Sequence, residues 1–280
     1  MTFSPYLAAI RLLAFLAVTG VLVVPYLLLF PLGTRVRRVF SGAWFRAGVS
    51  LTGLRLRTEG DMPAGCGALY AVNHVSYLDI PVLGALLDAE FVAKAEVRGW
   101  PLFGFLARIA LTQFVSRQAM QAPKERLAIA NRLASGRSII LFPEGSSSDG
   151  EGVLPFRSGL LSAALADDEL NIPVQPVSIV YGPAAKNARA LSRDHRDLYA
   201  WYGDMDLSPH LWRVFGANEK IDVKVIFHAP QPSSAFANRK ALALWAEEEV
   251  RDGIAQGLGA MFVSELPASA SSKSETTAAS

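Results

Sequence analysis

The sequence predicts an α/β protein with a mostly parallel central sheet flanked by helices, and with an N-terminal membrane-associated helical segment. Beyond residue 53, short apolar runs alternate with helical patterns, which is typical of a parallel sheet. Before residue 53 lies a long uncharged segment. The composition is 51% hydrophobic and 19% charged, with a mean hydropathy of +0.27, more apolar than an average soluble domain. We therefore expect an anchoring segment at 1–53, a catalytic domain at 54–263 and a disordered tail at 264–280.

The uncharged segment, LLAFLAVTGVLVVPYLLLF, covers residues 12–30. Its nineteen positions approach the roughly 20 residues that a membrane-spanning helix needs. A cleaved signal peptide is disfavoured because the run exceeds the usual apolar region of such peptides and no A-x-A site follows. A buried helix of a soluble protein remains an alternative. A re-entrant helix pair that never crosses the bilayer would give the same pattern.

Positive charge is concentrated around this segment. Residues 1–58 contain seven arginines and no acid, whereas the rest of the chain has a net charge of about −5. Arg35, Arg37 and Arg38 follow the apolar run, so a spanning helix would keep the rest of the chain in the cytoplasm. Residues 39–54 are apolar and aromatic around Arg46, which is typical of a helix lying among lipid headgroups. This combination favours an anionic lipid surface over nucleic acid.

The order of elements after residue 53 follows from the periodicity of apolar residues. Proline at the first helical turn and the capping residues set the expected helix starts. We expect residues 182–219 to be irregular. The expected strands are 54–58, 67–73, 90–94, 111–116, 138–142, 174–180 and 222–228, and the expected helices are 78–87, 101–109, 123–133, 158–166 and 235–258.

Several classes of site are disfavoured by composition. A single cysteine, Cys66, excludes an intrachain disulfide and a cysteine-rich zinc site. The four histidines are scattered without the spacing of metal ligands, so we expect no metal. No G-x-S-x-G motif occurs, which argues against a covalent serine enzyme.

The stretch NHVSYLDI, residues 73–80, places His74 five positions before Asp79. Residues five apart lie about 140° apart on a helix, so these two side chains meet only across a turn. The stretch follows a predicted strand and precedes a predicted helix, where α/β sheets bind ligands. A carboxylate bonded to one imidazole nitrogen makes the other a better base, so His74 is a candidate general base. The alternative is structural: Ser76 and Asp79 form a capping box, and His74 bonds to backbone.

A second stretch, FPEGSSSDG, follows the predicted strand at 138–142. Successive backbone N–H groups in such a turn, with serine hydroxyls beside them, can hold an anion or a developing oxyanion. Glu144 lies at the start of this loop. A plain strand-to-helix loop with a serine N-cap is the alternative.

These two stretches and NIPVQPVS, in this order behind an apolar segment, resemble the glycerolipid acyltransferase family typified by 1-acylglycerol-3-phosphate O-acyltransferase. The resemblance covers about residues 54–180. It implies His74 as general base and Asp79 as its orienting partner. It also implies direct transfer from an acyl carrier protein or coenzyme A thioester to a lysolipid hydroxyl, with no bound cofactor. The residues that it places in acceptor binding are Asn73, Ser76, Arg117, Glu144, Gly145 and Ser146.

The sequence departs from the family pattern where the family has arginine in F-P-E-G-T-R-S and this chain has Ser147. Loss of that arginine removes a bidentate ligand for phosphate. The pattern FPEGSSSDG…VLPFRSGLL resembles the bacterial branch of lyso-ornithine lipid O-acyltransferases, whose acceptor has an amino-acid headgroup. That branch implies the bacterial cytoplasmic membrane, with the catalytic domain on the cytoplasmic side. Trp201, Tyr202, Asp204 and Asp206 are candidates for the headgroup site, and the alternative is an exposed loop that docks on the domain. A lipid hydrolase and a noncatalytic membrane-binding protein remain the alternative functions.

Overall fold

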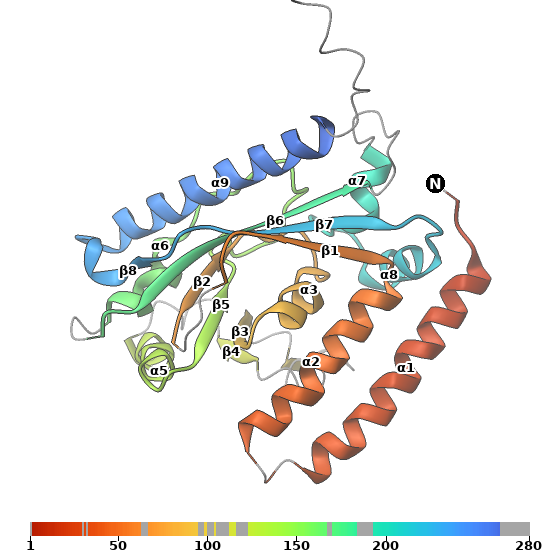
Figure 1. Cartoon of the computed structure of the whole chain (residues 1–280), viewed down its shortest axis with the longest axis horizontal. Helices are drawn as coiled ribbons and strands as arrows, with labels where there is room; N and C mark the ends of the chain where they lie inside the picture. Colours follow the sequence, from red (N-terminus) through yellow and green to blue (C-terminus); the bar gives the residue numbers. More distant parts are fainter. Residues whose placement is uncertain are drawn as a thin grey trace, which may run out of the picture.

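A computed structural model describes residues 2–29, 31, 33–62, 67–94, 98–99, 104, 112–115, 123–166, 170–183 and 193–263. Within these residues the strands form one eight-stranded sheet in the order β1-β7-β6-β2-β5-β3-β4, with β8 paired to β6 (Figure 1). The strands are β1 (Leu54–Glu59), β2 (Leu69–Val72), β3 (Ala89–Lys94), β4 (Gln113–Val115), β5 (Ser138–Leu141), β6 (Pro173–Pro183), β7 (Ile221–Phe227) and β8 (Gln231–Pro232).

Most neighbouring strands run parallel, as predicted. The parallel pairs are β1 with β7, β2 with β5 and β6, and β3 with β4 and β5. The antiparallel pairs are β6 with β7 and β6 with β8. Because β2, β5 and β6 are parallel and adjacent at the centre, their carboxyl ends meet at one edge of the sheet, where the loops after them lie together.

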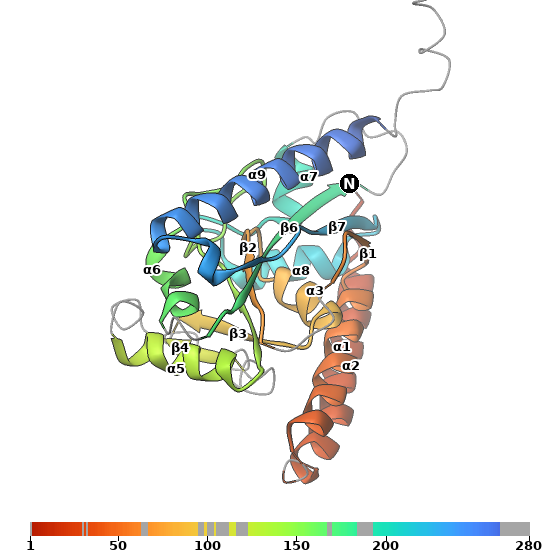
Figure 2. The same cartoon turned by 60° about the vertical axis from the view of Figure 1, so that its left-hand side comes forward.

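Helices cover both faces of the sheet. On one face lies α9 (Arg239–Val263), with α5 (Pro123–Ala134), α6 (Ser158–Leu161) and the 3-10 helix η4 (Ser162–Leu165). On the other face lie α2 (Thr34–Leu51), α3 (Asp79–Leu86), α7 (Arg193–Tyr199) and α8 (Leu207–Gly216) (Figures 1 and 2). All four residues of β2 are buried. Leu69 and Ala71 face the core between the sheet and α9, and Tyr70 and Val72 face the core between the sheet and α3.

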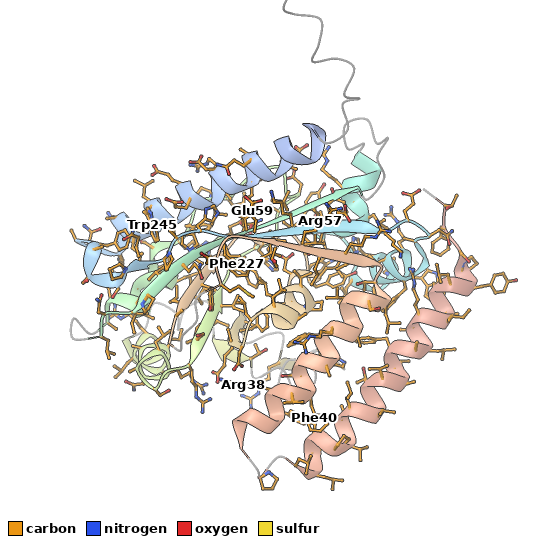
Figure 3. The ribbon with its side chains drawn as sticks, viewed as in Figure 1. Arg38, Phe40, Arg57, Glu59, Phe227 and Trp245 are labelled. Carbon is orange, nitrogen blue, oxygen red and sulfur yellow. The ribbon has the colours of Figure 1, made fainter. Side chains whose placement is uncertain are left out.

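The N-terminal segment forms an antiparallel hairpin of α1 (Pro5–Leu28) and α2, which extends away from the sheet (Figure 2). The Arg11 guanidinium of α1 donates to the carbonyls of Phe215 and Ala217, at 3.1 and 2.9 Å, and so satisfies carbonyls at the C-terminal end of α8. Phe40 lies between the two helices (Figure 3) and packs against Tyr26.

The outer face of α1 is apolar along its whole length. Most of the exposed apolar side chains recur every three or four residues, as one stripe of a helix. Among the described residues, α1 is the one helix that is long and apolar enough to cross a membrane. The exposed apolar residues of α1 are Tyr6, Ile10, Leu13, Leu16, Val21, Val24, Leu27 and Leu28.

Most predicted elements are present. Each predicted strand overlaps an observed strand, and β8 is an additional two-residue strand. The prediction of an irregular segment at 182–219 is wrong, because α7 and α8 lie within it. The last helix begins at Arg239, four residues later than predicted, because residues 233–235 form the 3-10 turn η5 (Ser233–Ala235). The predicted helix at 101–109, apart from residue 104, and the predicted disordered tail lie outside the described residues.

Candidate active site

The side chain of Asn73 fixes the chain where β2 ends. Its amide nitrogen donates to the Ile179 carbonyl at 2.9 Å, and its amide oxygen accepts from the Ile179 N–H at 2.7 Å. The side chain therefore replaces a backbone pairing with β6 after β2 stops, and it is fully buried. Since the amide is already bonded on both sides, its direct part in acceptor binding stays a prediction, while its part in positioning His74 is visible.

His74 and Asp79 meet across the turn between β2 and α3. The distance from His74 Nδ1 to Asp79 Oδ2 is 2.8 Å, and the His74 ring stacks on Phe142 with ring centroids 4.2 Å apart. The His74 side chain is 21% exposed, whereas Asp79 is fully buried. Since the carboxylate can only accept, Nδ1 carries the proton and Nε2 is left as the basic nitrogen.

The Asp79 carboxylate accepts hydrogen bonds from two parts of the chain, the turn after β2 and β6. Oδ2 also accepts from the backbone N–H groups of Val75 and Ser76, at 2.8 and 3.0 Å. Oδ1 accepts from the Tyr181 hydroxyl at 2.7 Å. Burial and the neighbouring carboxylate raise the pKa of Tyr181, so this hydroxyl stays protonated and donates.

Half of the alternative capping box is formed. The Asp79 carboxylate reaches back to the Ser76 N–H, but the Ser76 hydroxyl does not cap α3. The Ser76 Oγ is fully buried and has no hydrogen-bond partner among the described residues. The structural interpretation and the catalytic one therefore coexist at Asp79, whose carboxylate orders the loop and orients His74.

Glu144 links the second loop to the first. Its Oε1 accepts from the His74 N–H at 2.8 Å, and its Oε2 accepts from the Leu154 N–H at 3.1 Å. Burial raises the pKa of Glu144 to about 7, against the two backbone hydrogen bonds, which lower it. The Ser148 N–H donates to the His74 carbonyl at 2.8 Å, so both backbone polar groups of His74 are held by this loop.

The remaining predicted site residues lie around this core. Gly145 has a φ of +74°, a conformation that favours glycine, and Ser146 is exposed. The predicted acceptor ligand Arg117 lies outside the described residues. The loop after β2 and the loop after β5 thus come together, as their shared edge of the sheet requires.

Comparison with known proteins identifies the family of this chain. A family model described as Acyltransferase matches residues 53–180. Lyso-ornithine lipid O-acyltransferase of Brucella abortus is 40% identical over 77% of this chain and 81% of its own, and the Rhizobium meliloti protein of the same name is 35% identical over 79% and 76%. The chain belongs to the acyltransferase family. It is an enzyme, because the family and these relatives are acyltransferases.

Two further acyltransferases show similarity over most of their length. The 1-acyl-sn-glycerol-3-phosphate acyltransferase of Neisseria gonorrhoeae is 31% identical over 68% of this chain and 70% of its own. The crystal structure of the 1-acyl-sn-glycerophosphate acyltransferase PlsC from Thermotoga maritima superposes with a TM-score of 0.62 at 21% identity, covering 90% of this chain and 95% of that one. The fold is therefore that of this structure.

Three supports of the acyltransferase site gave no signal in the sequence. Tyr181 donates to Asp79 from 102 residues away. The Tyr77 hydroxyl bonds to Nδ1 of buried His210 at 2.9 Å, and His210 Nε2 donates to the Ala200 carbonyl at 3.0 Å. Burial lowers the pKa of His210, which favours this neutral form. The bonds of Tyr77 and His210 attach the His74 loop to α8 and, through Ala200, to the segment before it.

The headgroup candidates in that segment differ in placement. The backbone N–H of Trp201 donates to the Val75 carbonyl at 3.0 Å, beside His74, while Asp204 and Asp206 are exposed. Tyr202 donates to Asp197 at 3.1 Å. Among the described residues no group of histidine, cysteine, aspartate or glutamate side chains is arranged to hold a metal ion.

Proposed function

We propose that this acyltransferase moves a fatty acyl group from an acyl thioester to the free hydroxyl of a lysolipid, with His74 as the general base. The observation that carries the proposal is the bond from His74 Nδ1 to the buried Asp79 carboxylate, which leaves Nε2 as the basic nitrogen of a partly exposed ring. Nε2 has no recorded partner among the described residues. A substrate hydroxyl can occupy that position.

The chemistry follows from this geometry. His74 Nε2 takes the proton of the hydroxyl as its oxygen attacks the thioester carbonyl, and Asp79 stabilises the imidazolium that forms. The tetrahedral intermediate then breaks its carbon–sulfur bond, and the imidazolium returns the proton to the departing thiolate. In the second loop, the Gly145 and Ser148 amides donate to backbone carbonyls, whereas those of Ser146 and Ser147 have no recorded acceptor among the described residues. These two amides are the candidates for oxyanion stabilisation.

The acceptor class is supported by the named relatives, which are lyso-ornithine lipid and 1-acyl-sn-glycerol-3-phosphate acyltransferases. We place lyso-ornithine lipid first because the relatives from Brucella abortus and Rhizobium meliloti share that name, and lysophosphatidate second. The thioester belongs to acyl carrier protein or coenzyme A, and the proposal needs no bound cofactor. A lipid hydrolase would use the same base on water, and a noncatalytic membrane-binding protein would not need it.

A membrane location fits the hairpin. The backbone N–H of Ser4 donates to the Gly216 carbonyl at 2.9 Å, and α2 leads directly into β1, so both ends of the hairpin lie on the catalytic domain. We therefore favour a hairpin whose exposed apolar stripe enters the bilayer and returns on the same side. In a bacterial cell this side is the cytoplasmic face of the cytoplasmic membrane, where acyl thioesters are available.

The test is acyl transfer by the purified protein in detergent–lipid mixed micelles, with a radiolabelled acyl donor and either lyso-ornithine lipid or lysophosphatidate. His74→Ala should lower the rate by about 10²–10⁴-fold, because general-base assistance is lost. It should float with lipid vesicles as the wild type does, because the hairpin is a separate part of the chain. Transfer at the wild-type rate by His74→Ala would overturn the proposal, and fatty acid release without a donor would favour the hydrolase.

A further inference from the structure

An exposed arginine, Arg157, lies against the second loop of the site. Arg157 directly precedes α6, and its N–H donates to the Pro143 carbonyl at 2.9 Å, which ties the residue to the start of that loop. Its guanidinium packs on Gly145, so that a Cβ at Gly145 would lie 3.2 Å from Nε and 3.3 Å from Cζ. Glycine at this position therefore leaves room for the guanidinium. Glu144, the residue before Gly145, accepts a hydrogen bond from the His74 N–H.

Three carboxylates of this loop and of α9 are bonded to other partners. Glu144 accepts from two backbone amides. Glu151 pairs with Arg196 of α7, and Glu247 of α9 accepts from the Phe156 N–H and pairs with Arg251. Among the residues that the structure describes, no carboxylate or other acceptor is recorded for the Arg157 side chain.

Arg157 places a cation on the loop that also holds the backbone of His74. The loop of residues 142–151 contains no basic residue of its own, so Arg157 supplies positive charge at its surface. The side chain is exposed and therefore reachable by a ligand, while its backbone is fixed on the loop that holds His74. A guanidinium presents a planar fork of donors that matches a carboxylate or a phosphate.

Resting on the function proposed above, we infer that Arg157 binds the acidic group of the acceptor lipid and so sets its specificity. The amino-acid carboxylate of lyso-ornithine lipid and the phosphate of lysophosphatidate are each a few bonds from the hydroxyl that is acylated. An acidic group held over Gly145 places that hydroxyl towards His74, whose backbone is bonded to the neighbouring Glu144. Arg157 is thus a positioning residue for the acceptor and takes no part in proton transfer.

The experiment compares wild type, Arg157→Gln and Arg157→Lys in mixed micelles, with lyso-ornithine lipid and with its carboxyl methyl ester. Arg157→Gln should raise the KM for the free acid by about 10–100-fold, because a charge-assisted hydrogen bond is lost, and should leave kcat and the KM for the donor within about 3-fold. Esterification of the acceptor should raise the KM of the wild type by a similar factor. It should leave the KM of Arg157→Gln unchanged. Arg157→Lys should recover part of the affinity.

A parallel series with lysophosphatidate separates the two acidic groups, because the variant loses affinity for whichever acceptor Arg157 binds. Arg239→Gln is the matched control, since Arg239 is an exposed arginine at the start of α9. The inference would be overturned if Arg157→Gln raised the KM equally for the acid and the ester, or raised it for neither acceptor. In both cases acyl transfer by the wild type would still support the proposed function. If the wild type acylated neither lipid, the proposed function itself would fail.

Discussion

At the scale of single residues, Asp79 is where the site and the fold depend on the same atoms. A fully buried carboxylate is costly unless its oxygens are bonded. Here the donors are His74, two backbone amides of the turn and Tyr181. The carboxylate that orients the imidazole therefore also holds the turn in shape and joins it to β6.

Asp79→Asn separates these roles. The side-chain amide has one acceptor oxygen where the carboxylate has two, and its NH₂ group facing His74 favours the wrong imidazole tautomer. We expect kcat to fall by about 10³–10⁴-fold, as in other enzymes in which this change was made beside a catalytic histidine. Steady-state acyl transfer with saturating acceptor measures it.

Tyr181→Phe is the comparison variant, because it removes the donor to Oδ1 and leaves the tautomer of His74 unchanged. It should lower the free energy of unfolding by about 1–3 kcal/mol with a much smaller effect on kcat. Equal kcat values for Asp79→Asn and Tyr181→Phe would refute the tautomer argument.

The pairing of His74 with Asp79 could be predicted because its spacing and its place after a strand are local features of the sequence. Tyr181 could not be predicted, since nothing near it in the sequence marks a hydroxyl that reaches across 102 positions. The same holds for Arg157, whose guanidinium lies against Gly145, twelve positions earlier, only through the fold of the loop.

At the scale of elements, the hairpin and the site meet where α2 packs on α3. Close approach depends on two glycines: a Cβ at Gly84 of α3 would lie 2.4 Å from the Phe45 ring of α2, and one at Gly48 of α2 would lie 3.4 Å from Pro81. Since α3 begins at Asp79, the position of α2 bears directly on the start of the catalytic turn.

Gly84→Ala tests this contact. The added methyl overlaps the Phe45 ring, and relieving the overlap should cost about 1–3 kcal/mol of stability and lower kcat by displacing the start of α3. Thermal unfolding in detergent and acyl transfer are the two measurements. Adding Phe45→Leu should restore part of both, because it removes the ring that the methyl meets. A double variant no better than Gly84→Ala would place the cause outside this contact.

The strands and the longer helices could be predicted because each contains several turns or alternations of apolar residues. The helices α7 and α8 could not be predicted because they have only seven and ten residues and include charged residues, a proline and two histidines. Their packing against the core on the α3 side of the sheet, through Leu198, Tyr199 and Val214, stabilises helices that the local pattern does not show.

At the scale of the whole molecule, Glu144 joins the two halves of the site. It reaches from the loop after β5 to the His74 N–H after β2 and to the Leu154 N–H. Its carboxyl is almost completely buried, so the folded protein holds a proton more tightly there than the unfolded chain does. Folding and protonation at this position are therefore linked.

The sign of the linkage gives the last prediction. The pKa of Glu144 is raised from 4.5 to about 7 by folding, so its stabilising contribution is present below pH 4.5 and is lost as the pH rises through about 7. Glu144→Gln does not titrate, so the stability of the wild type relative to this variant should fall by about 3 kcal/mol between pH 4.5 and pH 8. Denaturant unfolding in detergent at both pH values measures it. Glu248→Gln, on the exposed side of α9, should show no such change. A constant difference between the wild type and Glu144→Gln would mean that folding does not raise the pKa of Glu144.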